Sequence, residues 1–266
     1  MSLLESSQGV ESLSIDPASC ALLLDIDGTL LDIAENPDEV IVPAELHAVL
    51  ARLQRGFGGA VALISGRSLS TIDHLFPHLA LFVVGCHGAE VRLSLDARTE
   101  ESPNESMRSL YAEPLSPNLR ARLKRLGEAH PGVIVEDKIF SVALHYRSAP
   151  AEGPALRARA HEICAEAAGE GIGLLEGKGV VEVKPVGIDK GRALRTLLGT
   201  TPFRGRRPVF IGDDVTDEAA FATLGEFSGI GISVGRPMAG ADHMLAGPGE
   251  VRTWLAALAV RAEHGR

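Results

Sequence analysis

The sequence predicts an α/β protein in which a doubly wound, Rossmann-like parallel sheet carries an inserted α+β domain. Three observations indicate this fold. Short apolar runs without polar alternation, typical of strands buried on both faces, recur between stretches with helical spacing. Polar residues directly follow several of these runs. A central stretch instead shows the order helix, strand, strand twice, which indicates a separate domain.

The first part of the chain alternates strands and helices. An apolar run over 21–24 ends at Asp25 and reads as a buried strand that opens into a tight turn. A helix is expected from Pro43 to Leu53, because apolar residues recur there at helical spacing after a proline. The next expected elements are a strand over 60–64, a short helix through Leu75 and a strand over 81–84.

The middle of the chain is expected to be the inserted domain. A polar, proline-containing stretch from about Thr99 to Pro117 reads as a connection that leaves the first sheet. The expected elements after it are helices over 119–130 and 154–168 and strands over 133–136, 139–146, 174–176 and 180–183. Residues 108–185 would form a four-stranded, mostly antiparallel sheet with both helices on one face, and residues 1–107 and 186–266 the core.

The strands of the insert have one apolar and one polar face, because alternate side chains of a strand point to opposite sides. The set expected to lie on the helices is Phe140, Val142, Leu144, Tyr146, Val181 and Val183. The opposite set is Ser141, His145, Arg147, Glu182 and Lys184. For an isolated domain a solvated face explains this pattern, whereas opposite a catalytic core the same face is expected to contact a ligand.

The last part of the chain returns to the first pattern. The expected elements are a helix opening at 189–191, a strand over 209–211, a helix beginning at 216–218, a strand over 230–234 and an amphipathic helix over 251–262. Together with the first part, these elements complete the parallel sheet.

Composition excludes several classes of protein. The chain has 266 residues and a net charge of −9, which argues against nucleic acid or an anionic membrane as the main partner. The three cysteines, Cys20, Cys86 and Cys164, are far apart and are expected to be reduced thiols. Residues 1–17 lack the features of a signal peptide, and no apolar stretch is long enough to cross a membrane, so a cytoplasmic protein is expected. The sequence does not indicate an oligomeric state.

Polar residues stand at the carboxyl ends of four of the expected strands, the edge where open parallel sheets bind ligands. They are Asp25, Asp27, Ser65, His87, Asp213 and Asp214. Asp25 and Asp27 would lie on the same side of the backbone and repel each other by roughly 4 kcal/mol at about 4 Å for an effective dielectric near 20. A cation would offset this repulsion, and carboxylates without a matching His or Cys cluster favour Mg²⁺.

These residue types are suited to phosphoryl transfer. A carboxylate can attack phosphorus to give an aspartyl-phosphate that water hydrolyses, and Asp25 is placed for that attack. Asp27 is suited to protonate the leaving alkoxide and later to deprotonate the water. Ser65 and Lys190 would stabilise the phosphoryl oxygens. Each signal alone is compatible with ordinary structure, such as an acidic helix start after Asp213, but their order along the chain favours a site.

The same residues resemble the four motifs of the haloacid dehalogenase-like phosphatases, which are Mg²⁺-dependent and use an aspartyl-phosphate. The matching residues are Asp25-Ile-Asp27-Gly-Thr, Ser65, Lys190 and Gly212-Asp213-Asp214. The position of the insert after the third strand resembles the larger cap class of that superfamily. Finer strings at 63–67, 85–90, 143–147, 181–185 and 212–218 are similar to those of trehalose-6-phosphate phosphatases. The resemblance runs from about Leu22 to Trp254.

The resemblance implies a role for each matching residue. Asp25 would be the nucleophile and Asp27 the general acid and base. Mg²⁺ would be held by Asp25, the Asp27 carbonyl and Asp213, with Asp214 and Asp217 in support. The residues expected to bind substrate are Arg67, His87, Glu136, Lys138, Arg147, Lys178 and Glu182.

The function expected from the motifs and the insert together is hydrolysis of trehalose 6-phosphate. A related phosphatase acting on sucrose phosphate or another phosphosugar is an alternative that the core motifs permit and the strings of the insert oppose. A non-catalytic sugar-phosphate sensor is a further alternative, against which the intact Asp25, Asp27, Lys190 and Asp213 argue. In each case the expected partner is a small phosphosugar.

Overall fold

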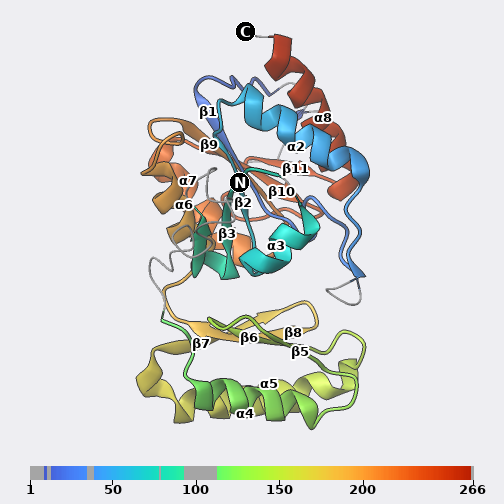
Figure 1. The fold of residues 1–266 in the computed structure, drawn as a ribbon, viewed down its shortest axis with the longest axis vertical. Coiled ribbons are helices and arrows are strands. Elements are labelled where there is room, and N and C mark those ends of the chain that lie inside the picture. The colour runs from blue at the N-terminus through green and yellow to red at the C-terminus, as the bar shows by residue number, and fades with distance from the viewer. Residues whose placement is uncertain (1–8, 11–12, 35–38, 78, 93–112, 265–266) are drawn as a thin grey trace. The chain divides into compact units, whose positions relative to one another are not determined.

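The computed structural model describes residues 9–10, 13–34, 39–77, 79–92 and 113–264 (Figure 1). The chain divides into two compact units, one formed by Met1–Arg108 with Asp189–Arg266 and the other by Ser109–Ile188. The expected connection over Thr99–Pro117 lies largely outside the described residues.

The larger unit contains a seven-stranded sheet in the order β11-β10-β9-β1-β2-β3-β4. Its strands are β1 Cys20–Leu24, β2 Val61–Ile64, β3 Phe82–Gly85, β4 Glu90–Arg92, β9 Arg207–Gly212, β10 Ile230–Val234 and β11 His243–Leu245. All neighbouring strands are parallel except β3 and β4, which are antiparallel. The predicted parallel sheet is therefore confirmed. Strands β4 and β11 were not predicted, because they have three residues each and are too short to show a pattern.

Helices cover this sheet on both faces (Figure 1). They are α2 Ala44–Gly56, α3 Leu69–Leu75, α6 Lys190–Leu198, α7 Glu218–Leu224 and α8 Pro248–His264, with short 3₁₀ turns η2 Cys86–Gly88, η6 Val215–Asp217 and η7 Gly225–Phe227. Helix α2 packs against α8, and α6 packs against α7 (Figure 1). This is the layered arrangement of a doubly wound α/β fold.

Strand β1 lies at the centre of the sheet, between β9 and β2. Its residues Leu22, Leu23 and Leu24 are fully buried, as an unalternating apolar run requires when both faces are covered. Leu24 pairs with Ile211 of β9 and with Leu63 of β2. This register brings the carboxyl ends of the central strands to one edge of the sheet.

The smaller unit is a four-stranded antiparallel sheet in the order β5-β6-β8-β7, with α4 and α5 on one face (Figure 1). Its elements are α4 Pro117–Glu128, β5 Ile134–Asp137, β6 Val142–His145, η4 Pro150–Glu152, α5 Gly153–Glu166, η5 Ala168–Glu170, β7 Ile172–Gly177 and β8 Val180–Pro185. The expected repeat of helix, strand and strand is confirmed.

The core of the smaller unit lies between this sheet and the two helices. It contains Val142, Leu144, Tyr146, Val181 and Val183 together with leucines of both helices. The alternation predicted for these strands is confirmed for those five residues. It is wrong for Phe140, which is half-buried and outside this core. Strand β6 begins only at Val142, because the chain first turns through Ile139 with φ of 70°.

The remaining general expectations concern the cysteines and the membrane. All three cysteines are free thiols; Cys20 and Cys86 are buried and Cys164 is half-buried. Among the helices that the structure describes, none has the length and apolar character needed to cross a membrane.

Candidate active site

Four strands of the larger sheet end at the polar residues noted in the sequence. Asp25 follows β1, Ser65 follows β2, His87 follows β3 and Asp213 follows β9. The backbone amide of Asp25 donates to the Ile211 carbonyl at 3.0 Å, so the end of β1 lies beside the end of β9. The amide of His87 donates to the Ser65 carbonyl at 2.9 Å. The structure thus brings these residues to one edge.

Lys190 joins two carboxylates at this edge. It is the first residue of α6, whose N-terminus is capped by the Asp189 side chain accepting from the Arg192 amide at 2.8 Å. The Lys190 Nζ donates to Oδ1 of Asp25 and to Oδ1 of Asp217, each at 2.6 Å. Burial opposes the charge, but the carboxylates of Asp217 and Asp25 outweigh it and raise the pKa of Lys190 above its usual value. The side chain is therefore a buried ammonium.

Asp25, Asp213 and Asp217 form a buried acidic cluster, each offering an oxygen within 4.8 Å of those of the other two. Burial raises the pKa of Asp25 well above its ordinary value, Lys190 opposes this, and the Asp217 and Asp213 carboxylates add to it. Buried carboxylates at such separations repel, and a divalent cation held between them would offset the repulsion. The oxygen donor set suits a hard cation.

Asp217 already uses both of its oxygens within the protein. Oδ1 accepts from Lys190, and Oδ2 accepts from the backbone amides of Asp213 at 2.9 Å and Asp214 at 3.0 Å. The Asp214 side chain completes a reciprocal capping box at the start of η6. Asp217 and half-buried Asp214 thus shape the turn that presents Asp213, while Asp217 also orients Lys190.

The turn after Asp27 approaches Asp213 closely. Gly28 has φ of 81°, and a Cβ added there would lie 2.3 Å from Oδ2 of Asp213. Only glycine fits both the left-handed backbone and the contact. The turn is closed by the Gly28 amide, which donates to the Leu31 carbonyl at 2.8 Å.

Asp27 itself is held by an arginine. Arg67 donates from Nε to Oδ2 of Asp27 at 2.7 Å and from Nη2 to Oδ1 at 2.8 Å. The backbone of Arg67 is fixed in turn, because its amide donates to the Ser65 hydroxyl at 3.1 Å. Arg67 was expected among the substrate-binding residues, and its pairing with Asp27 was not predicted. The available signal was weak: a basic residue three positions after the end of β2, which neighbours β1.

His87 is held in an unusual backbone conformation. Cys86 and His87 have φ of 47° and 57°, which is costly for two consecutive residues with side chains. The imidazole lies directly over Gly66, where an added Cβ would be 2.5 Å from Cε1 and Nε2. The amide of Cys86 donates to the Arg67 carbonyl at 2.8 Å and fixes the turn. His87 is thereby placed beside the end of β2.

In the smaller unit the expected substrate-binding residues form two groups. Lys138 Nζ lies 3.2 Å from Oε1 of Glu182 and 3.6 Å from Oε2 of Glu136. Arg147 Nη2 donates to the Lys178 carbonyl at 3.0 Å, in the turn between β7 and β8. Neither group belongs to the helix-packed core of this unit, as the strand alternation predicts for Arg147 and Glu182.

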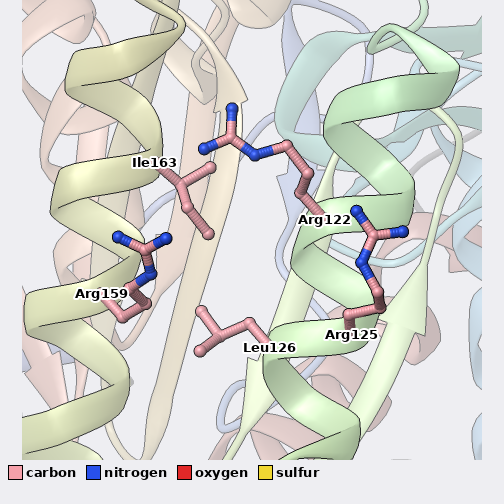
Figure 2. Close-up of a pocket in the computed structure, with 5 residues that line it drawn as sticks. All are labelled: Arg122, Arg125, Leu126, Arg159 and Ile163. Carbon is pink, nitrogen blue, oxygen red and sulfur yellow. The ribbon is translucent and has the colours of Figure 1, made fainter.

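The helical layer of the smaller unit has a pocket of about 250 Å³ between α4 and α5. Figure 2 shows its lining, which consists of Arg122, Arg125, Leu126, Arg159 and Ile163. None of the expected site residues lines it. Two of its arginines are neutralised by Glu166 and Glu162 at the surface, so we assign the pocket no part in the candidate site.

Comparison with known proteins agrees with this geometry. A family model described as Trehalose-phosphatase matches residues 23–246. The chain is 40% identical to a probable trehalose-phosphate phosphatase of Sinorhizobium fredii, covering 94% of this chain and 92% of the relative. It is 34% identical to the trehalose-6-phosphate phosphatase of Escherichia coli, covering 94% and 90% of the two chains.

A solved structure of a trehalose-6-phosphate phosphatase related protein matches with a TM-score of 0.73 and 26% identity, covering 92% of this chain and all of that one. The family model spans most of the chain, and the two relatives exceed 30% identity over nearly their whole lengths. The chain therefore belongs to the trehalose-phosphatase family, whose members are phosphoric monoester hydrolases.

Proposed function

We propose that the protein hydrolyses trehalose 6-phosphate to trehalose and phosphate through an aspartyl-phosphate on Asp25. The observation that carries the proposal is the buried contact of Asp25 with Lys190, 2.6 Å long, at a strand end in a chain of this family. A carboxylate in such a contact is oriented for attack, and the ammonium lies where negative charge on a phosphoryl group would develop.

In the first step Asp25 attacks phosphorus, a new oxygen–phosphorus bond forms, and the bond from phosphorus to the sugar oxygen breaks. The departing alkoxide takes a proton from Asp27. In the second step Asp27, now a carboxylate, takes a proton from a water that attacks the aspartyl-phosphate. Phosphate leaves and both aspartates return to their starting states.

The donor set at the sheet edge fits Mg²⁺. We propose that Asp25, the backbone carbonyl of Asp27 and Asp213 hold it, with Asp214 and Asp217 in support. Asp217 is excluded as a direct ligand in this arrangement, because Lys190 and two backbone amides already occupy its oxygens. When bound, Mg²⁺ would neutralise charge on the phosphoryl oxygens and lower the barrier to attack. The Ser65 hydroxyl and Lys190 would donate to the same oxygens.

We infer that residues 108–185 act as a cap that recognises the sugar. Carboxylates accept hydrogen bonds from sugar hydroxyls, and lysine and arginine donate to them. The cap residues proposed to make these contacts are Glu136, Lys138, Arg147, Lys178 and Glu182. Arg67 and His87 of the core are proposed to border the reacting end of the substrate.

Phosphate release from a panel of phosphosugars, with and without Mg²⁺, tests the proposal. Trehalose 6-phosphate, sucrose 6-phosphate and glucose 6-phosphate form the panel, because the core side chains would treat their phosphoryl groups alike. We expect the highest kcat/KM for trehalose 6-phosphate and little release without Mg²⁺. A higher value for another sugar would reassign the substrate, and no release from any of them would leave a sugar-phosphate sensor.

A further inference from the structure

The polar face of the smaller sheet is organised around one alanine. Ala143 of β6 pairs with Glu136 of β5 on one side and with Glu182 of β8 on the other. Residues paired across strands share a face, as do residues two apart along a strand. His145 therefore shares this face with Ala143, and the two glutamates flank Ala143 across the sheet. Ser141 precedes β6, and its hydroxyl reaches the same face because it donates to Glu182. Ala143 is itself 1% exposed, and its short methyl side chain lies among these four polar neighbours.

Lys138 and one further residue contact each glutamate. Oε1 of Glu182 accepts from the Ser141 hydroxyl at 2.5 Å and from Lys138 Nζ at 3.2 Å. Oε2 of Glu136 lies 3.0 Å from His145 Nε2 and 3.6 Å from the same Lys138 Nζ. Lys138 thus bridges both carboxylates. In addition, Glu182 contacts Ser141 and Glu136 contacts His145.

These contacts fix side chains that would otherwise be costly to bury. Glu182, Ser141 and Lys138 are all less than a tenth exposed. A buried carboxylate needs hydrogen bonds to remain ionised. Here the donors are Ser141 and Lys138 for Glu182 and His145 for Glu136. Burial would raise the pKa of Glu136, but the hydrogen bond from His145 and the charge of Lys138 outweigh it and lower the pKa. Glu136 is therefore an ionised acceptor, and Glu182 is held in a set orientation by Ser141 and Lys138.

We propose that Ser141 and His145 are positioning residues for sugar recognition, which hold Glu182 and Glu136 in the orientations in which these carboxylates accept from hydroxyl groups of the sugar. This inference rests on the proposed function. A carboxylate fixed before binding loses no rotamer freedom when the sugar binds. Removing the residue that fixes it should therefore weaken binding of the sugar. The chemistry at phosphorus would be unaffected, because neither residue is proposed to touch the reacting atoms.

The test uses the 266-residue chain with Mg²⁺ and compares two substrates: trehalose 6-phosphate and p-nitrophenyl phosphate, which has no sugar. We expect Ser141→Ala and His145→Ala each to raise KM for trehalose 6-phosphate by about 10-fold, the loss of one hydrogen bond to a charged group. We expect kcat/KM for the aryl phosphate to stay within about twofold of the wild type. Glu182→Ala serves as the reference for direct loss of a sugar contact.

The structure offers closely matched controls in the same unit. His161 Nε2 lies 3.1 Å from Oε1 of Glu176, the geometry of the His145 pair, but its side chain is 62% exposed. Ser148 is an exposed serine three residues after His145. We expect His161→Ala and Ser148→Ala to leave KM and kcat/KM unchanged for both substrates. Ser141→Thr and His145→Gln, which keep a donor, should recover most of the lost affinity.

The outcomes separate the inference from the function on which it rests. If the wild type releases phosphate from the aryl substrate but not from trehalose 6-phosphate, the proposed function fails and the inference fails with it. If the wild type acts on the sugar and the Ser141 and His145 variants match the two controls, the inference alone is overturned. Equal losses on both substrates, or no recovery in the Thr and Gln variants, would indicate a purely structural role and also overturn it.

Discussion

Arg67 donates hydrogen bonds to both carboxylate oxygens of Asp27, from Nε at 2.7 Å and from Nη2 at 2.8 Å. The arginine side chain is 9% exposed and the aspartate side chain 35%, so the pair lies at the rim of the buried site. A planar guanidinium with two parallel bonds fixes the plane as well as the position of a carboxylate. In the proposed reaction Arg67 therefore orients Asp27, and one of the two contacts is released when Asp27 carries the proton that it gives to the leaving oxygen.

Replacing Arg67 by alanine should lower kcat for trehalose 6-phosphate by about 10- to 100-fold, because a charge-assisted bidentate contact is lost from the general acid. The loss should be smaller for p-nitrophenyl phosphate, whose leaving group needs less help from an acid. The matched control is Arg92→Ala, since Arg92 holds Asp73 of the same unit by two bonds of 2.8 and 2.6 Å. Equal effects of the two variants on kcat would contradict the role.

Asp25→Asn should abolish turnover on every substrate, with a loss of about four orders of magnitude or more in kcat, because an amide cannot form the aspartyl-phosphate. Phosphate release and circular dichroism would be measured together. Asp32→Asn serves as the control, because Asp32 follows in the same segment but its side chain is 74% exposed. Near-wild-type activity in the Asp25 variant would rule out the proposed nucleophile.

Mg²⁺ binding should strengthen as the pH rises. Burial and the neighbouring carboxylates raise the pKa of Asp25. Protons therefore compete with the metal for this carboxylate up to a higher pH than they would at an exposed aspartate. The folded pKa exceeds the unfolded one, so ionisation of Asp25 destabilises the metal-free protein as the pH rises through the folded value, and bound Mg²⁺ offsets this loss.

Calorimetric titration and thermal unfolding at about pH 5 and about pH 8 would check this linkage. We expect tighter Mg²⁺ binding and a larger rise in Tm on adding Mg²⁺ at the higher pH. Asp213→Asn should remove most of both responses. Affinity that does not change between the two pH values would argue that Asp25 does not hold the metal.

Gly28→Ala should impair both stability and Mg²⁺ binding. Its φ of 81° strains any residue with a side chain, and the new methyl would collide with Asp213. Gly205→Ala is the control, because Gly205 has φ of 78° but nothing lies within 4 Å of an added Cβ. The control should lose about 1 kcal/mol of unfolding free energy from backbone strain alone. A Gly28 variant with unchanged Mg²⁺ affinity would contradict the close approach.

The fold was predictable where a local pattern was long enough to be seen. The strands β1, β2, β3, β9 and β10 are buried on both faces and contain short apolar runs, which indicate that a strand is present and where it lies in the chain. The three-residue strands β4 and β11 carry no such pattern. Phe140 shows a different limit: alternation predicts a face only while the strand continues, and the turn at Ile139 interrupts it.

The candidate site was predictable as a set of residues but not as a set of contacts. Asp25, Ser65, His87 and Asp213 could be grouped because parallel strands end at a common edge. The partner of each side chain could not be read in this way. Ser141 is separated by 41 residues from Glu182, and Arg67 by 40 from Asp27. Which of several nearby polar groups pair is decided by register and rotamer, and these come only with the folded chain.

The smaller unit is one uninterrupted stretch of chain, Ser109–Ile188, whereas the larger unit is assembled from segments on either side of it. The five cap side chains that we propose to contact the sugar all lie within that stretch, and Asp25 and Lys190 lie outside it. A single genetic exchange could replace the stretch whole and leave the reacting carboxylates as they are. In this architecture a lineage can acquire a new substrate without having to evolve a new reaction.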